Sequence, residues 1–249
     1  MIGYPRAGIT AAAIVGALLA APLQAGTADV QEALANPERS EAERALDESR
    51  MPAEVIAFSG IEEGAVVADF MAGGGYYTAL LARQVGPDGR VYAVNPAGFH
   101  DPKVWEPVLR DNANIRVMPV APQAMLIAPG SVDTIFTHLV FHDLYWESEQ
   151  YKFPRLDVDF VLANWFAAVK PGGSVIVVDH VGPAGDPREI TQSLHRIDPE
   201  TVIAAMSRAG FTLEKRSDML QRSEDDGAKN VFDPEIRGKT DRFVMKFRR

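Results

Sequence analysis

Cysteine is absent from all 249 residues of the chain. Its absence excludes disulfide bonds, metal sites built from thiolates, and catalysis by a thiol nucleophile. It does not identify a redox compartment, because a chain without cysteine folds equally well in an oxidising or a reducing environment. The absence of cysteine therefore limits the chemistry of the protein but does not indicate its cellular compartment.

Basic residues are scarce relative to acidic ones. The chain has 25 lysines and arginines against 34 aspartates and glutamates, which gives a formal net charge of -9 at pH 7. A surface of this sign repels phosphate backbones. Nucleic acid is therefore excluded as the expected partner, and a small molecule is the expected substrate.

Only one long apolar run is present, and it lies near the N-terminus. Residues 9–21 follow the positive Arg6 and precede a stretch of small residues, a pattern typical of a secretory signal. We expect residues 1–28 to be a signal peptide that is cleaved after Ala25 or Ala28 and directs export to the periplasm. The run is shorter than the about 20 residues of a membrane span, so no stable anchor is expected after cleavage. An uncleaved anchor is the alternative.

Residues 29–249 are expected to form a single domain. The chain is 47% hydrophobic, which is enough for one sizeable core at this length. Polar, helix-forming sequence predicts N-terminal helices at about residues 30–60, packed onto the start of the main fold. No internal repeat divides the chain.

Short apolar strands alternate with helices beyond Gly64. Strands are predicted at 65–70, 90–94, 115–120, 132–137, 174–179, 211–215 and 241–247. Helices are predicted at 76–84, 102–112, 157–169 and 199–209. This alternation predicts an α/β protein with a Rossmann-like, mostly parallel seven-stranded sheet and helices on both faces. A long polar segment without helical pattern precedes the last strand, which favours an antiparallel hairpin at one edge.

A glycine-rich loop connects the first strand of this pattern to its first helix. Gly73, Gly74 and Gly75 follow the buried strand that ends near Asp69. Glycines let a ligand approach the backbone, and the next helix offers free N–H groups at its positive end. Ligands bind at this place in open α/β sheets. A plain tight turn is the alternative, but three glycines cost backbone entropy, which favours a binding loop.

The loop Asp69–Gly75, the turn Lys170–Gly173 and the strand order resemble class I S-adenosylmethionine-dependent methyltransferases. The resemblance covers roughly residues 50–249 and is nearest to a group of exported bacterial proteins known only as predicted methyltransferases. It implies S-adenosylmethionine as the cofactor. Asp69 would then lie near the amino-acid end of the cofactor, and the glycines of the loop would lie beneath its adenosine.

The chain departs from this family at two positions. The family usually has glycine in place of Met71 and an acid in place of Asn95. A carboxylate at the end of the second strand would accept charge-assisted hydrogen bonds from the ribose hydroxyls. Asn95 offers a neutral acceptor and a donor, so we expect a weaker ribose contact from it. A simple turn residue is the alternative, because Asn-Pro favours turn initiation.

A nicotinamide-binding fold is the rival interpretation of the loop. Its fingerprint has a further glycine or alanine where this chain has Thr78, and an acid about 20 residues on, where this chain has Asn95. The turn Lys170–Gly173 and the edge hairpin also favour the methyltransferase interpretation.

Four of the five histidines lie near the predicted C-terminal ends of strands: His138, His142, His180 and His195. In the resembled family the segment after the fourth strand lies beside the cofactor methyl group, and His142 falls where many small-molecule methyltransferases have a histidine. Histidine takes up protons near neutral pH, so His142 and His195 are predicted to assist proton removal from the acceptor. The alternative for each is a histidine satisfied by structural hydrogen bonds.

A metal site is a further alternative at this edge of the sheet. His138 and His142 share a face if their segment is helical, and Asp143 and His180 could complete a zinc or iron site. The spacing does not require an ion, so no metal ligand is predicted.

Two functions follow from these observations. The first is methyl transfer from S-adenosylmethionine to an unidentified small-molecule acceptor. The alternative is an exported binding or accessory protein that keeps the fold without methyl transfer. Export motivates the alternative, because the cofactor is made in the cytoplasm.

Overall fold

A computed structural model describes residues 1, 3, 25–37 and 39–249 of the chain. The apolar run of the predicted signal peptide lies outside the described residues, so its cleavage and export stay predictions. Within the described part, no helix has both the length and the apolar character needed to cross a membrane.

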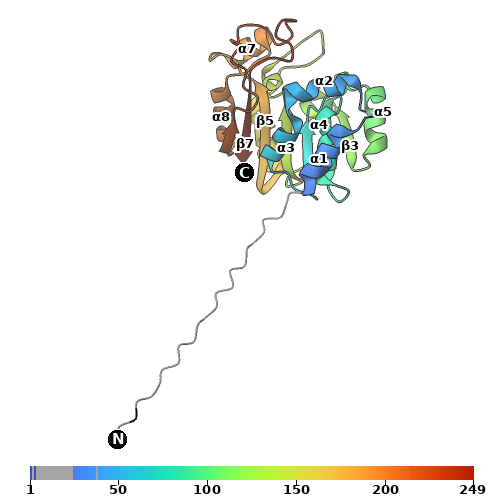
Figure 1. The fold of residues 1–249 in the computed structure, drawn as a ribbon. Helices are drawn as coiled ribbons and strands as arrows, with labels where there is room; N and C mark the ends of the chain where they lie inside the picture. Colours follow the sequence, from blue (N-terminus) through green and yellow to red (C-terminus); the bar gives the residue numbers. More distant parts are fainter. Residues whose placement is uncertain (2, 4–24, 38) are drawn as a thin grey trace.

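The chain forms one seven-stranded sheet, as the alternating pattern predicts (Figure 1). The strands are β1 Val66–Phe70, β2 Arg90–Pro96, β3 Ile115–Val120, β4 Val132–His138, β5 Val169–His180, β6 Thr212–Ser217 and β7 Arg242–Arg248. Their spatial order is β3-β2-β1-β4-β5-β7-β6. Neighbouring strands among the first five are parallel, whereas β7 runs antiparallel to both β5 and β6. The predicted antiparallel hairpin is therefore confirmed as β6 and β7.

Helices surround the sheet: α1 Ala25–Ala35, α2 Glu41–Arg50, α3 Pro52–Ser59, α4 Tyr76–Val85, α5 Pro102–Asp111, α6 Val158–Ala168, α7 Pro187–Leu194 and α8 Pro199–Arg208. Short 3-10 helices are η1 Ala97–Phe99, η2 Pro122–Ala124 and η3 His142–Tyr145. Several begin at an aspartate whose side chain accepts a backbone N–H, as Asp186 does for α7 and Asp198 for α8. The helix α7 is an addition to the predicted elements.

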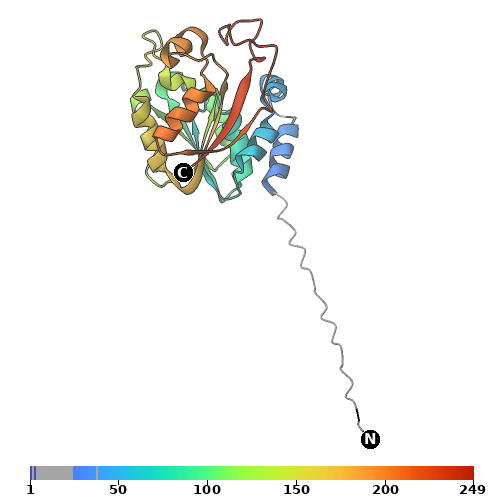
Figure 2. The same ribbon diagram turned by 90° about the vertical axis from the view of Figure 1, so that its left-hand side faces the viewer.

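Alternate residues of the strands face opposite sides of the sheet and build two cores. In β5, Val175 and Val177 pack with the core under α6 and α8, whereas Ile176 and Val178 pack with the core under α1, α3 and α4. Figure 2 shows these helices as two layers on either side of the sheet. Burial on both faces explains why the central strands are continuously apolar.

The turn predicted at Lys170–Gly173 is a bulge in the first part of β5. Val169 pairs with Val132 and Ser174 with Thr134, so the residues between them leave the ladder opposite Asp133. The ammonium group of Lys170 lies 2.8 Å from Oδ1 of Asp133. The ion pair holds the bulge at the edge opposite the loops that follow the parallel strands.

The carboxyl ends of the parallel strands form the upper edge of the sheet in Figure 1. The end of β7, which runs the other way, lies at the bottom, and both α2 and α7 lie at the top. The connections after β1, β2, β4 and β5 meet along this edge, where open α/β sheets bind their ligands.

Candidate functional site

The loop between β1 and α4 has a backbone that glycine adopts readily. Gly73 and Gly75 have φ values of +58° and +87°, in the left-handed region. Met71 also has a positive φ, +56°, a conformation that costs a residue with a side chain about 1 kcal/mol or more. Its N–H donates to the carbonyl of Val94 at 2.7 Å, which ties the start of the loop to β2. Met71 thus adopts a left-handed backbone conformation that glycine would adopt at lower cost.

Asn95, near the end of β2, holds the same loop through its side-chain amide. Its Oδ1 accepts from the N–H of Gly73 at 3.1 Å, and its Nδ2 donates to the carbonyl of Gly73 at 3.0 Å. The residue is 1% exposed. Both polar atoms that a ribose would contact are therefore already bonded to the loop.

Asp69 lies near the end of β1, buried below the loop. Its Oδ2 accepts a hydrogen bond from the hydroxyl of Thr78, the third residue of α4, at 2.5 Å. Burial raises the pKa of Asp69 to about 7, and the Thr78 hydrogen bond offsets part of that rise. The carboxyl group is therefore poised to change its charge near neutral pH.

The first glycine of the loop has free space beside it, whereas the next two are packed against α5. A Cβ added to Gly73 would meet no described protein atom within 4 Å. A Cβ on Gly74 would lie 3.3 Å from Val104, and one on Gly75 would lie 3.0 Å from Trp105, both in α5. Substituting Gly74 or Gly75 would therefore disturb the packing of α5, so Gly73 is the position that reports on free space beside the loop.

Positive charge gathers at the N-terminus of α4. The guanidinium carbon of Arg50, at the end of α2, lies 4.4 Å from the ring centre of Tyr76, the first residue of α4. Burial lowers the pKa of Arg50, and burial together with repulsion from Arg50 lowers that of Arg242 to about 10. Within the described part of the chain, the guanidinium of Arg50 has no ion pair within 4 Å and no hydrogen-bond acceptor; the carboxylate of Asp47, bonded to Arg39 and to the hydroxyl of Tyr76, is a more distant negative charge that offsets part of the fall in the pKa of Arg50. This place is suited to an anionic group of a ligand.

His138 ends β4 beside this positive group. Its ring centre lies 4.5 Å from that of Tyr77, and its Nε2 is buried without a hydrogen-bond partner in the described structure. Burial and the nearby charges of Arg50 and Arg242 lower the pKa of His138 well below its ordinary value. His138 is therefore a neutral ring at physiological pH.

His142 opens η3 and is held by Asp179 of β5. Nδ1 of His142 lies 2.8 Å from Oδ1 of Asp179, and its backbone N–H donates to Oδ2 at 2.8 Å. Burial alone would lower the pKa of His142, but the charges of Asp179 and Asp143 and the hydrogen bond to Asp179 raise it to about 9. The position of the ring is thus set by two contacts with one buried carboxylate.

Asp143 joins the two predicted catalytic histidines. Its Oδ1 lies 3.4 Å from Nε2 of His142 and 3.8 Å from Nδ1 of His195. His195 follows α7 with a φ of +51° and lies between the rings of Trp146 and Phe232, with centroid distances of 5.5 and 5.0 Å. Two histidines and one carboxylate therefore converge at the carboxyl edge of the sheet.

A buried ion pair fixes the segment that contains His195. Arg196 forms two hydrogen bonds with the carboxylate of Asp225, at 2.8 and 2.9 Å, and its side chain is fully buried. It also donates to the carbonyls of Val181 and Lys229. Through Asp225 the polar segment before β7 is folded back onto the end of the sheet, which brings Phe232 to His195.

The predicted site residues thus lie in two groups at one edge of the sheet. The first comprises Asp69, Gly73, Gly74, Gly75 and Asn95; the second comprises His142 and His195. Asp179 and Arg50 were not predicted as part of this arrangement, because no spacing in the sequence relates them to the residues they meet. Asp143 was considered only as a metal ligand with His138, His142 and His180, and its contact with His195 was not predicted.

The metal grouping considered from the sequence is not the one that forms. His138 and His142 do not share a helix, because β4 ends at His138 and Leu139 turns with a φ of +59°. His180 is bonded through Nδ1 to the hydroxyl of Thr240 at 2.8 Å. Asp143 instead pairs His142 with His195.

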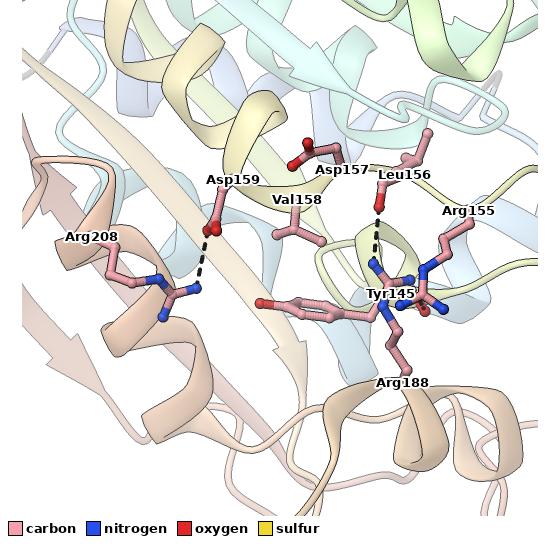
Figure 3. Close-up of a pocket in the computed structure, with 8 residues that line it drawn as sticks. All are labelled: Tyr145, Arg155, Leu156, Asp157, Val158, Asp159, Arg188 and Arg208. Carbon is pink, nitrogen blue, oxygen red and sulfur yellow. Dashed lines mark hydrogen bonds and ion pairs between the residues drawn. The ribbon is translucent and has the colours of Figure 1, made fainter.

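A separate cavity of about 520 Å³ lies beside η3 (Figure 3). Its wall includes Tyr145, whose hydroxyl points toward Arg208 of α8, and Arg188 of α7, which donates to the carbonyl of Leu156 at 2.9 Å. Arg208 is paired with Asp159 of α6 at 3.1 Å. Arg188 and Arg208 thus already have hydrogen-bond or ion-pair partners within the protein, whereas the guanidinium of Arg50 has none within hydrogen-bonding distance in the described residues.

No known protein-family model matches the chain. Among solved structures, an S-adenosylmethionine-dependent methyltransferase from Aquifex aeolicus matches with a TM-score of 0.56 and 21% identity, over 89% of this chain and 97% of that one. One from Mesorhizobium loti matches with a TM-score of 0.57 and 15% identity, over 82% and 100%. Geranyl diphosphate C-methyltransferase from Streptomyces coelicolor, in complex with S-adenosyl-L-homocysteine, matches with a TM-score of 0.55 and 16% identity, over 88% and 87%. The chain therefore has the Rossmann-like fold of S-adenosylmethionine-dependent methyltransferases.

Proposed function

We propose that the chain binds S-adenosylmethionine at the loop Asp69–Gly75 and transfers its methyl group to a small-molecule acceptor beside His142. The observation that carries the proposal is the free space at Gly73. This left-handed glycine, at the carboxyl end of β1, leaves room for a ligand against the backbone. The shared methyltransferase fold supports the choice of ligand.

The charges around the loop fit the amino-acid end of the cofactor. Arg50 has no acceptor in the described part of the chain and lies at the positive end of α4, so it would bind the cofactor carboxylate. Asp69 is the buried acid on the other side of the loop, and a nearby ammonium group would favour its ionised form. Each charged group of the amino acid therefore has a complement of opposite sign.

S-adenosylmethionine supplies an electrophilic methyl group on its sulfonium sulfur. The protein contributes position, holding cofactor and acceptor in line along the carboxyl edge of the sheet. His142, Asp143 and His195 lie at that edge. Asp143 and His195 offer a carboxylate and a ring nitrogen to the proton of the acceptor, whereas His142, whose pKa is raised to about 9, would take up that proton only above neutral pH and donates a hydrogen bond below it. The acceptor is a small molecule, consistent with the acidic net charge of the chain.

Binding of S-adenosylhomocysteine by calorimetry tests the cofactor site. Gly73→Val places a side chain in the free space, so affinity should fall by about ten-fold or more. Gly130→Val is the matched control, because Gly130 has a φ of +61° and equally open surroundings, but lies before β4 at the opposite edge of the sheet. It should bind as the unmodified chain does. Absence of binding to the unmodified chain, or equal loss in both variants, would reject the proposal.

Turnover separates methyl transfer from simple binding. The chain is incubated with S-adenosylmethionine that carries a labelled methyl group and with a set of small phenols, amines and carboxylic acids. Labelled product that forms in the unmodified chain and is lost in Gly73→Val supports the enzyme. Tight binding without product from any acceptor would support the binding or accessory alternative.

A further inference from the structure

We infer that His142, Asp143 and His195 form a binding site for a divalent transition-metal ion. One ligand atom from each residue lies within 4.8 Å of the others. Donor atoms around Zn²⁺, at bond lengths of about 2.1 Å, lie about 3.4 Å apart in a tetrahedral site. The separations of 3.4 and 3.8 Å from Oδ1 of Asp143 are near that value. A small shift of the His195 ring toward Asp143 would therefore bring the protein ligand atoms to the spacing of a bound ion.

Asp179 gives His142 the support that metal-binding histidines typically have. The carboxylate engages Nδ1 of His142 and also accepts the backbone N–H groups of His142 and His180. Nδ1 is thereby occupied, and Nε2, the atom nearer to Asp143, is left for the ion. A carboxylate on the second ring nitrogen fixes the orientation of the ring and increases its basicity as a ligand.

Contacts with neighbouring residues stabilise His195 in a backbone conformation that is unfavourable by itself. Its left-handed φ of +51° is unfavourable for a residue with a side chain. The buried pair of Arg196 with Asp225 and the ring of Phe232 hold this segment against η3. The side chains of His195 and Asp143 remain 16% and 19% exposed, so an ion can reach them from solvent.

Three protein donors are fewer than the four of a closed structural site. Two nitrogens and one carboxylate oxygen suit zinc and other divalent transition ions, and they leave at least one coordination position open. An acceptor oxygen bound there would lose its proton more readily. This role in catalysis rests on the proposed function, whereas the metal site itself does not.

Zinc binding by the full chain, purified without a polyhistidine tag and stripped with a chelator, tests the site. We expect one Zn²⁺ per chain by calorimetry, and Co²⁺ should give the visible absorption of a low-symmetry site. Asp143→Asn and His195→Asn should each weaken Zn²⁺ binding by about 100-fold; asparagine is chosen at 195 because it tolerates the left-handed backbone. Glu147→Gln and His100→Gln, an acid and a histidine outside the cluster, are matched controls that should bind as the unmodified chain does.

The outcomes are distinguishable from those for the cofactor. Circular dichroism and thermal melting show that each variant is folded before its affinity is compared. No stoichiometric zinc in the unmodified chain, or equal zinc affinity in Asp143→Asn, would overturn the metal site. S-adenosylhomocysteine binding is measured without metal on the same preparation and should be unchanged in Asp143→Asn. A chain that binds the nucleoside but no zinc rejects only the metal site, and the converse rejects only the proposed function.

Discussion

Asp69→Asn should stabilise the cofactor-free protein above neutral pH and remove a pH dependence of its stability. Asp69 is 3% exposed, and the hydrogen-bond partner of its carboxyl group in the described structure is the hydroxyl of Thr78. Asparagine has nearly the same shape and keeps an oxygen that accepts this bond. The substitution therefore removes the charge while leaving the packing of β1 against α4 in place.

The magnitude follows from the raised pKa. Burial moves the pKa of Asp69 from 3.8 to about 7 in the folded state. Because the folded value is the higher one, the protonated group stabilises the fold fully below pH 3.8, and this stabilisation is lost as the pH rises through 7. A difference of about three pKa units corresponds to roughly 4 kcal/mol of unfolding free energy. The Asp69→Asn variant has no such loss, so its advantage over the unmodified chain should be near zero at about pH 4 and largest at about pH 8.

Urea denaturation of both proteins at several pH values between about 4 and 8 measures the effect. Asp133→Asn is a control of opposite sign. Burial alone would raise the pKa of Asp133, but the hydrogen bonds from Lys170 and Val66 lower it overall. Its ionised form therefore stabilises the fold above its unfolded pKa, and Asp133→Asn should destabilise the protein at neutral pH. Parallel stability curves for Asp69→Asn and the unmodified chain across this range would refute the reasoning.

Two further substitutions and one sequencing experiment test other predictions. Asp225→Asn leaves the buried guanidinium of Arg196 without its charge partner, so urea denaturation should show a loss of about 3 kcal/mol; a loss below about 1 kcal/mol would contradict the anchoring role. Arg50→Gln should weaken S-adenosylhomocysteine binding by about ten-fold in calorimetry, whereas the exposed Arg110→Gln should not; equal affinities would remove Arg50 from the cofactor site. N-terminal sequencing of the protein from the periplasm should show cleavage at one of the two predicted sites, and retained Met1 would reject the signal peptide.

The fold was predictable because periodicity and helix signals agree along most of the chain. Apolar strands alternate with amphipathic or apolar helices, and glycine or proline marks many of the boundaries. The helix α7 was not predicted because its sequence is largely polar and contributes few residues to the core. Its start was nevertheless visible, since Asp186-Pro187 repeats the Asp-Pro beginning of α8 at Asp198-Pro199. Local capping chemistry indicated this helix where the hydrophobic pattern did not.

The site was predictable only where its residues are close in the sequence. The loop from Asp69 to Gly75 is local, so its glycines could be identified directly. The contact of Asp143 with His195 depends on how α7 returns to the sheet, through the pairing of Val181 with Ile197 and the ion pair of Arg196. Such contacts follow from tertiary packing, and no periodicity or spacing encodes them.

Asn95 shows how one departure from a family pattern can have a different meaning in three dimensions. From the sequence it is a weaker substitute for an acid that binds ribose. In the structure its amide both donates to and accepts from Gly73, a pair of bonds that a carboxylate cannot make, because it has no donor. Asn95→Asp would therefore remove the hydrogen bond to the carbonyl of Gly73 and place a negative charge beside that carbonyl. The substitution would destabilise the loop in the cofactor-free protein. A ribose that bonds to Asn95 must likewise replace Gly73 as its partner, so the free energy of releasing the loop is subtracted from that of binding the cofactor.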